Sequence, residues 1–186
     1  TAVLETFLAR LDAAWAKPGR VYLIGDTTQV FEGWRTWTDE AELAADVEDH
    51  DAFAETVQTA AAETGLAVWV EHPADVIPLP DGFDERHRPA AQAGVRHLDV
   101  QHFDPYSIAF RFIARGDEPD YHLVLAYLDH GWITWAEMDR LLSELLSRFS
   151  MQTIQQDPAE FRRKYKGLRQ MAQSVRPGTI HRHTPA

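Results

Sequence analysis

The chain of 186 residues contains no cysteine. This absence excludes thiolate nucleophiles, zinc sites built from cysteine, and disulfide bonds. No apolar run approaches the roughly 20 residues that a membrane-spanning helix needs. The first residues also lack a basic stretch followed by an apolar segment, so we expect no secretory signal. These absences favour a cytoplasmic protein without a membrane partner.

Common catalytic motifs are missing as well. The nine histidines are scattered and none forms the helix-borne HExxH pair of zinc hydrolases. There is no Gly-x-Ser-x-Gly turn, no phosphate-binding P-loop and no dinucleotide-binding glycine motif. The sequence therefore argues against these hydrolase and nucleotide-binding classes.

Positive charge is scarce. The chain has 18 Lys and Arg against 29 Asp and Glu, a net charge of -11, so the whole protein should repel nucleic acid. Its cations gather from Arg140 onward, which gives an acidic body and a basic C-terminal segment. That segment is either a solvated helix face or a surface that binds RNA or a partner protein.

The spacing of apolar residues predicts an α+β fold, in which a short mixed sheet with flanking helices precedes a helical C-terminal half. Helices are expected over residues 3–16, 26–32, 50–64, 105–115, 118–130, 134–149 and 157–175. Strands are expected over residues 21–24, 40–45, 66–70, 75–77 and 97–103, with a loop over 78–94. We divide the chain into a core over 1–103, a helical region over 104–176 and a flexible tail over 177–186.

The segment with most chemical information joins a turn at Gly25 to two acids, Glu40 and Glu42. Carboxylates at i and i+2 of a strand point to the same face, with Cα atoms roughly 6.5–7 Å apart. This geometry suits hard divalent cations, which prefer oxygen ligands. Asp75, from a neighbouring strand, is the candidate third acid of a two-ion site, with Glu71 as the alternative. The competing interpretation is the solvated face of an edge strand.

The order of these motifs resembles the nucleotidyltransferase superfamily. The resemblance rests on Leu23-Ile24-Gly25-Asp26, a gap of thirteen residues, and an acid-apolar-acid-apolar run at Glu40-Ala41-Glu42-Leu43. It narrows to small bacterial nucleotidyltransferase-like proteins related to abortive-infection toxins, through Arg35, Thr38, Asp75-Val76-Ile77-Pro78-Leu79-Pro80, Asp104-Pro105-Tyr106 and Ala114-Arg115-Gly116. The similar region covers roughly residues 20–130.

The resemblance implies a Mg²⁺-dependent transferase that uses a nucleoside triphosphate. By this likeness Glu40, Glu42 and Asp75 are the catalytic acids that hold magnesium. The residues of the nucleotide-binding site are then Gly25, Asp26, Thr27, Arg35 and Thr38, of which Gly25 and Thr27 contact phosphate and Arg35 compensates charge. Three positions depart from the family. Asp26 replaces the usual Gly or Ser beside the triphosphate, Glu40 replaces an aspartate, and Phe112 stands where relatives often carry a lysine, which leaves Arg111 and Arg115 as nearby cations. A carboxylate at position 26 would repel phosphate.

Four further side chains have two interpretations each. Trp34 and Trp37 either stack on a base or pack beneath a loop, and packing is favoured. Arg86 and Arg88 either approach a phosphate or lie on the loop surface, and the surface is favoured.

Two functions follow. One is a metal-dependent nucleotidyltransferase that moves a nucleoside monophosphate onto RNA or protein. The other is a degenerate member of that fold, without catalysis, that binds a partner in a toxin–antitoxin-like pair. The sequence leaves a homo-oligomer open.

Overall fold

The structure is a computed structural model that describes residues 2–90, 95–152 and 156–175. Its helices are α1 (Ala2–Trp15), α2 (Asp26–Phe31), α3 (His50–Thr64), α4 (Pro105–Arg115), α5 (Glu118–Asp129), α6 (Trp135–Gln152) and α7 (Pro158–Val175). Its strands are β1 (Gly19–Ile24), β2 (Glu40–Asp46), β3 (Ala67–Val70), β4 (Arg88–Pro89) and β5 (Leu98–His102). The expected α+β fold is confirmed.

The strands form one mixed sheet in the order β3-β2-β1-β5-β4. Strand β1 lies antiparallel to β2 and parallel to β5, while β2 and β3 run parallel. The short β4 pairs antiparallel with β5 at the other edge. This order places β2, which carries the acid pair, between β1 and the edge strand β3.

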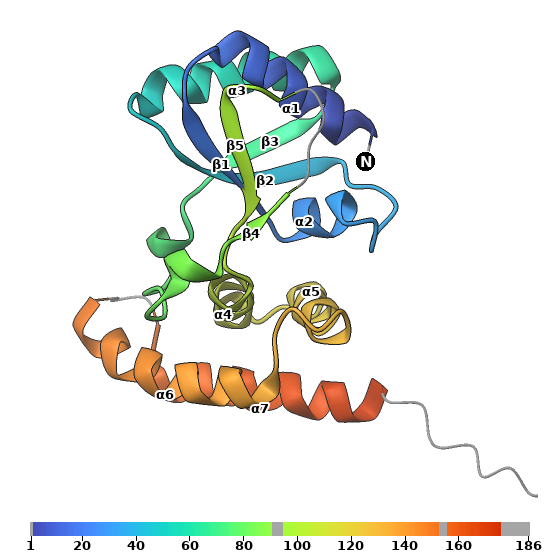
Figure 1. Cartoon of the computed structure of the whole chain (residues 1–186). Coiled ribbons are helices and arrows are strands. Elements are labelled where there is room, and N and C mark those ends of the chain that lie inside the picture. The colour runs from blue at the N-terminus through green and yellow to red at the C-terminus, as the bar shows by residue number, and fades with distance from the viewer. Residues whose placement is uncertain (1, 91–94, 153–155, 176–186) are drawn as a thin grey trace, which may run out of the picture.

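The two faces of the sheet are covered by different helices. Helices α1 and α3 lie on one face (Figure 1), where Phe7 and Phe53 join the buried side chains of Val21 and Leu43. Asp12 of α1 is buried, and its carboxylate accepts the backbone N–H groups of residues 96, 97 and 98 at 3.0, 2.7 and 2.8 Å. A buried carboxylate is tolerated here because backbone donors satisfy it, and it fixes the start of β5.

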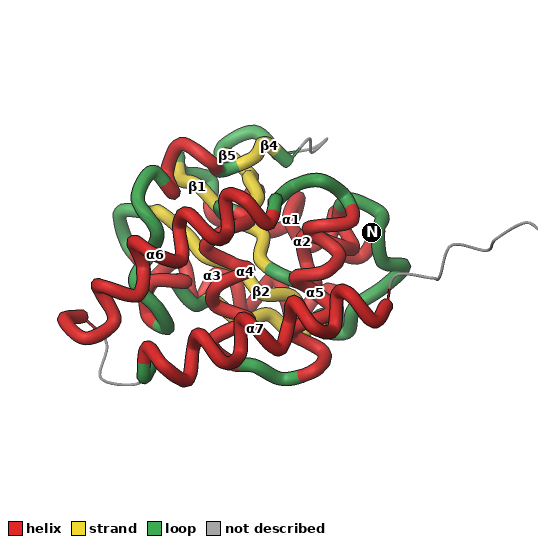
Figure 2. The backbone as a smooth tube through the Cα atoms, turned by 90° about the horizontal axis from the view of Figure 1, so that it is seen from below, coloured by secondary structure: helices red, strands yellow, loops and turns green. Residues whose placement is uncertain are grey.

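The helical half lies against the other face (Figures 1 and 2). Helix α4 is the central element, because every residue from Pro105 to Ala114 is buried. Its apolar side chains share one core with Tyr22 and Ile24 of β1 and with α5, α6 and α7. Asp104 caps the N-terminus of α4, since its carboxylate accepts the N–H groups of Tyr106 and Ser107.

Two predictions about segments were wrong. Residues 75–77 do not form a strand, because a 3₁₀ helix covers Pro73–Asp75. Pro73 fits the first turn of such a helix, and the ring nitrogen Nδ1 of His72 accepts the N–H of Ala74 at 3.2 Å. The expected loop over 78–94 contains a 3₁₀ helix at Phe83–Arg86 and strand β4. The expected tail over 177–186 lies outside the described residues.

Candidate functional site

The two acids of β2 lie on one face of the strand and beside the turn at Gly25. Glu42 is the register partner of Ile24, the last residue of β1, and Gly25 follows directly. A Cβ built on Gly25 would lie 3.5 Å from a carboxylate oxygen of Glu42. The strand pairing therefore brings together the turn and the acid pair that the sequence singled out.

An aromatic ring covers the turn. Gly25 is buried and has φ 58° and ψ −123°, a conformation that glycine adopts at little cost. A Cβ at this position would lie 2.6 Å from Cζ of Phe112, so the ring of α4 packs directly on the glycine backbone. In this conformation the Phe112 ring fills the space directly beside the Gly25 backbone.

The predicted phosphate contacts are used within the protein. Thr27 is fully buried, and its Oγ1 accepts the backbone N–H of Glu42 at 2.7 Å, which ties α2 to β2. The guanidinium of Arg35 pairs with the carboxylate of Asp26, and both side chains are partly exposed. Thr38 donates its hydroxyl to the carbonyl oxygen of Glu40 at 2.7 Å and so helps to start β2.

Arg111 of α4 sits between two carboxylates. Its Nη1 donates to Oε2 of Glu42 at 3.1 Å, and its Nη2 pairs with Oε2 of Glu71. The Arg111 side chain is only 4% exposed, whereas those of Glu42 and Glu71 are 28% and 49% exposed. Arg115, one turn further along α4, places Nη1 3.7 Å from the other oxygen of Glu42. We call the group formed by Glu42, Glu71, Arg111 and Arg115 the arginine bridge.

The network continues to α5 through Asp120. Nε of Arg115 lies 3.2 Å from Oδ2 of Asp120, whose side chain is buried. Burial is the main cause that raises the pKa of Asp120, and the Arg115 charge opposes it. Nε of Arg111 and Oδ2 of Asp120 are buried without a well-directed hydrogen bond among the described residues.

The other acid of β2 is held by an indole. Trp69 of β3 is the register partner of Glu42, and its Nε1 donates to Oε2 of Glu40 at 3.1 Å. The neighbouring strand thus supplies an indole, not a third carboxylate, at the position beside the pair.

The donor set does not fit the expected magnesium site. Asp75 lies in a 3₁₀ helix and not on a neighbouring strand, which removes the reason for choosing it as the third acid. Across the described parts of the chain, no three acids or histidines form a group that could hold a metal ion. Glu71, the alternative third acid, does approach Glu42, but a guanidinium lies between them.

Sequence reasoning named Arg111 and Arg115 only as nearby cations and missed what they contact. Their spacing of four residues places both on one side of a helix that is otherwise apolar, and this was the available signal. The positions of Phe112 and Trp69 depend on contacts between distant segments, and we find no local signal for them.

Three of the four remaining candidates, all except Trp37, have a ring or charge partner within the protein. Trp34 stacks on His130 with ring centres 4.1 Å apart, which confirms packing, but Trp37 is 63% exposed, so packing beneath a loop was wrong for it. Arg86 is not loop surface, because it forms two hydrogen bonds to the buried carboxylate of Asp104 at 3.0 and 2.9 Å. The guanidinium of Arg88 lies 4.3 Å from the ring centre of Trp132.

A buried polar chain runs behind the turn. His102 of β5 contacts Oγ1 of Thr28 at 3.1 Å and a carboxylate oxygen of Glu32 at 2.9 Å, and the His102 side chain is 1% exposed. Burial lowers the pKa of His102, and the Glu32 charge opposes this effect. These contacts join β5 to α2, and the inaccessibility of His102 and Thr28 indicates a structural role.

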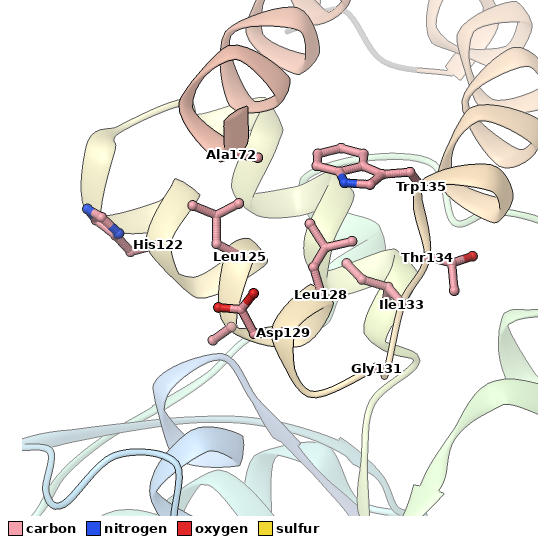
Figure 3. A pocket seen from close by; sticks show the side chains of 10 residues that line it. His122, Leu125, Leu128, Asp129, Gly131, Ile133, Thr134, Trp135 and Ala172 are labelled. Carbon is pink, nitrogen blue, oxygen red and sulfur yellow. The ribbon is translucent and has the colours of Figure 1, made fainter. Parts of the chain in front are cut away.

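A groove of about 630 Å³ lies elsewhere, between α5, the start of α6 and α7. In Figure 3, Leu125 and Leu128 of α5 face the space bounded by Trp135 and Ala172. Asp129 and His122 also line it. None of the predicted site residues lines this groove.

The basic C-terminal segment is partly engaged in packing. Nζ of Lys164 donates to the carbonyl oxygen of Ala114 near the end of α4. Arg169 donates to Asp139 at 2.8 Å and lies 4.8 Å from the ring centre of Trp135. Arg162 and Lys166 of α7 are exposed.

Comparisons with protein-family models, curated proteins and solved structures found no match. Among the described helices, none has the length and apolar character needed to cross a membrane. The resemblance to nucleotidyltransferases therefore stays a prediction from the residues quoted above.

Proposed function

We propose that this chain is a nucleotidyltransferase-like protein that has lost nucleotide transfer and works by binding a partner. The observation that carries the proposal is the guanidinium of Arg111, which lies between Glu42 and Glu71, the alternative third acid of the predicted metal site.

Electrostatics supports this assignment. Arg111 neutralises the charge that would attract magnesium, and it is almost fully buried. A metal ion held by both Glu42 and Glu71 would have to displace the guanidinium from both carboxylates and leave a buried cation without its counter-charges, which costs several kcal/mol. Mg²⁺ also loses its water ligands reluctantly and needs near-octahedral oxygen coordination.

The environment of the turn gives independent support. Phe112 packs on Gly25, and the Thr27 hydroxyl is occupied by the Glu42 backbone. Catalysis requires reacting groups to be placed within fractions of an ångström. A triphosphate would need both the ring and the arginine bridge to move.

The metal-dependent transferase is the second candidate. It is favoured by one observation, namely that Glu40 and Glu42 share a face of β2 beside the Gly25 turn. In that case Mg²⁺ and a nucleoside triphosphate are the expected ligands, with RNA or protein as acceptor.

Removing the arginine tests the proposal directly. We expect millimolar Mg²⁺ to leave the melting temperature of the wild type unchanged and to raise that of Arg111→Ala, because the freed carboxylates then attract the ion. The added substitution Glu42→Gln should abolish this rise. Arg140→Ala is a matched control, since Arg140 also contacts two glutamates, at 2.6 and 2.7 Å, on the exposed side of α6.

Calorimetry separates the two candidates. Each nucleoside triphosphate is titrated with magnesium into the wild type and into Glu40→Gln/Glu42→Gln. The proposal expects no binding at millimolar ligand in either protein. Magnesium-dependent binding by the wild type that the double substitution removes would establish the transferase candidate and overturn the proposal.

A further inference from the structure

The two edges of the sheet differ in how they are protected. Strand β4 has only two residues, Arg88 and Pro89, and proline and charge both discourage further strand pairing. Strand β3 has the sequence Ala-Val-Trp-Val, without charge or proline. No strand in the described ranges pairs with its outer side.

The backbone of β3 presents hydrogen-bonding groups to that outer side. Ala67 and Glu71 donate their N–H groups to the carbonyl oxygens of Asp39 and Leu43 at 3.3 and 2.9 Å. The backbone groups of every second residue, starting from Ala67, therefore face β2. The N–H and C=O groups of Val68 and Val70 consequently point away from the sheet. The side chain of Gln58 donates to the Val68 carbonyl at 3.3 Å and so occupies that acceptor. Val70 lies at the opposite end of the outer side of β3.

Exposed apolar side chains gather at the same edge. Trp69 is 61% exposed and Val70 is 40% exposed, and alternation along the strand places them on opposite faces. Trp37, 63% exposed, precedes β2 by three residues. Of the four large apolar side chains that are exposed in the described ranges, only Val3 lies outside this region.

The surroundings are acidic. Residues 36–51 and 66–80 contain no Lys or Arg, whereas they contain nine acids in all. Glu40 and Glu71 lie on the same face of the sheet as Trp69. The even-numbered residues of β2 pair with the odd-numbered residues of β3, as Glu42 does with Trp69. A second copy of the chain added edge to edge would oppose these acids, which is unfavourable.

We propose that the free edge of β3 binds an extended basic segment of a partner protein, which adds to the sheet as a further strand. Backbone bonds to the N–H of Val68 and to the N–H and C=O of Val70 supply affinity, and Lys or Arg side chains on the Trp69 face contact the indole ring and Glu40. This inference deepens the proposed function by naming the kind of partner, and it rests on that function.

The test uses a labelled peptide of six alternating lysine and valine residues, acetylated and amidated, at about 150 mM salt, where long-range attraction is screened. We expect binding by fluorescence anisotropy and shifts of backbone NMR signals that concentrate on residues 67–71. Methylation of the peptide amides, which keeps its charge, should weaken binding at least tenfold.

Protein variants complete the test. Trp69→Ala should weaken binding at least tenfold, whereas Val3→Ala, on the opposite face, should leave it unchanged. Equal binding by Trp69→Ala, or equal binding of the methylated peptide, would reduce the effect to net charge and overturn the inference. Dimerisation of the free protein through residues 67–71 would assign the edge to a second copy and overturn it as well. If the protein binds nucleotide in a magnesium-dependent way and also binds the peptide through Trp69, the proposed loss of nucleotide transfer is overturned. The inference about the edge of β3 then stands.

Discussion

The two ends of α4 each carry an arginine–carboxylate contact, but they are built differently. At the N-terminal end, Asp104 is fully buried and receives two hydrogen bonds from Arg86. It also accepts the N–H groups of Tyr106 and Ser107 and the Ser107 hydroxyl, the last at 2.7 Å. Every lone pair direction of this carboxylate is used, as expected for a group that holds a fold together.

At the C-terminal end the arginine bridge is incomplete. Arg111 is buried with one N–H undirected, while its partners Glu42 and Glu71 are partly exposed to water. The exposed sides of these two carboxylates are open to water or to a ligand, unlike those of Asp104. The buried partner is the carboxylate of Asp104 at one end of α4 and the guanidinium of Arg111 at the other. The comparison teaches that a buried charge marks structure where its hydrogen-bonding groups are all used, and a candidate site where they are not.

The largest expected effect on stability is at the N-terminal end of α4, where the carboxylate of Asp104 is fully hydrogen-bonded. Asp104→Ala should lower the free energy of unfolding by about 3–5 kcal/mol, because it removes the helix cap and leaves Arg86 without its counter-charge. Urea denaturation measures this. Asp81→Ala is the control. The Asp81 side chain is 81% exposed and lies 3.1 Å from Arg148, so its loss should change the free energy of unfolding by less than about 0.5 kcal/mol. A loss below about 1 kcal/mol for Asp104→Ala would contradict the distinction.

The next effect concerns the covered turn at the other end. Gly25→Ala should cost about 2–4 kcal/mol, from backbone strain and from overpacking against Phe112 together. Gly33→Ala is the matched control, since Gly33 also has positive φ but its Cβ would meet nothing within 4 Å. Its cost should be about 1 kcal/mol.

Phe112→Leu added to Gly25→Ala separates the two causes. The shorter side chain should recover part of the lost stability, measured by the same denaturation. If the double variant is no more stable than additivity predicts, the ring does not press on Gly25.

Arg111→Ala should cost less than Asp104→Ala, about 1–3 kcal/mol, because its carboxylate partners can turn to water. A double-mutant cycle with Glu42→Gln measures the coupling between the two side chains. A coupling energy near zero would show that the bridge is an accidental contact and not a neutralised acid pair.

The sequence predicted what depends on neighbours along the chain. Periodicity gave the helices, and the i, i+2 rule placed Glu40 and Glu42 on one face of β2. The strand predicted over 75–77 was wrong. Val76 and Ile77 are β-branched and apolar, as strand residues often are, and Ile77 is fully buried, but the segment follows a 3₁₀ helix that begins at Pro73.

The chemistry of the site depends on distant segments, and this is why it could not be predicted. Arg111 is 69 residues from Glu42 in sequence, and Trp69 is 29 residues from Glu40. Only the docking of α4 on the sheet and the register of β3 determine that these acids meet a guanidinium and an indole in place of a third carboxylate.

The smallest effect sharpens the comparison through pH. The pKa of Asp120 is raised above its ordinary value, chiefly by burial, so the folded protein binds this proton more tightly than the unfolded chain does. Stability from this group therefore falls as the pH rises through the folded pKa, and the ionised carboxylate is a cost at neutral pH. Asp120→Asn should match or exceed the wild type by up to about 1 kcal/mol at pH 7, an advantage that shrinks as the pH falls toward 4. Thermal unfolding at several pH values, with Glu55→Gln as an exposed control, measures this; a large loss at pH 7 would mean that Arg115 and Asp120 form a complete pair like the one at Asp104.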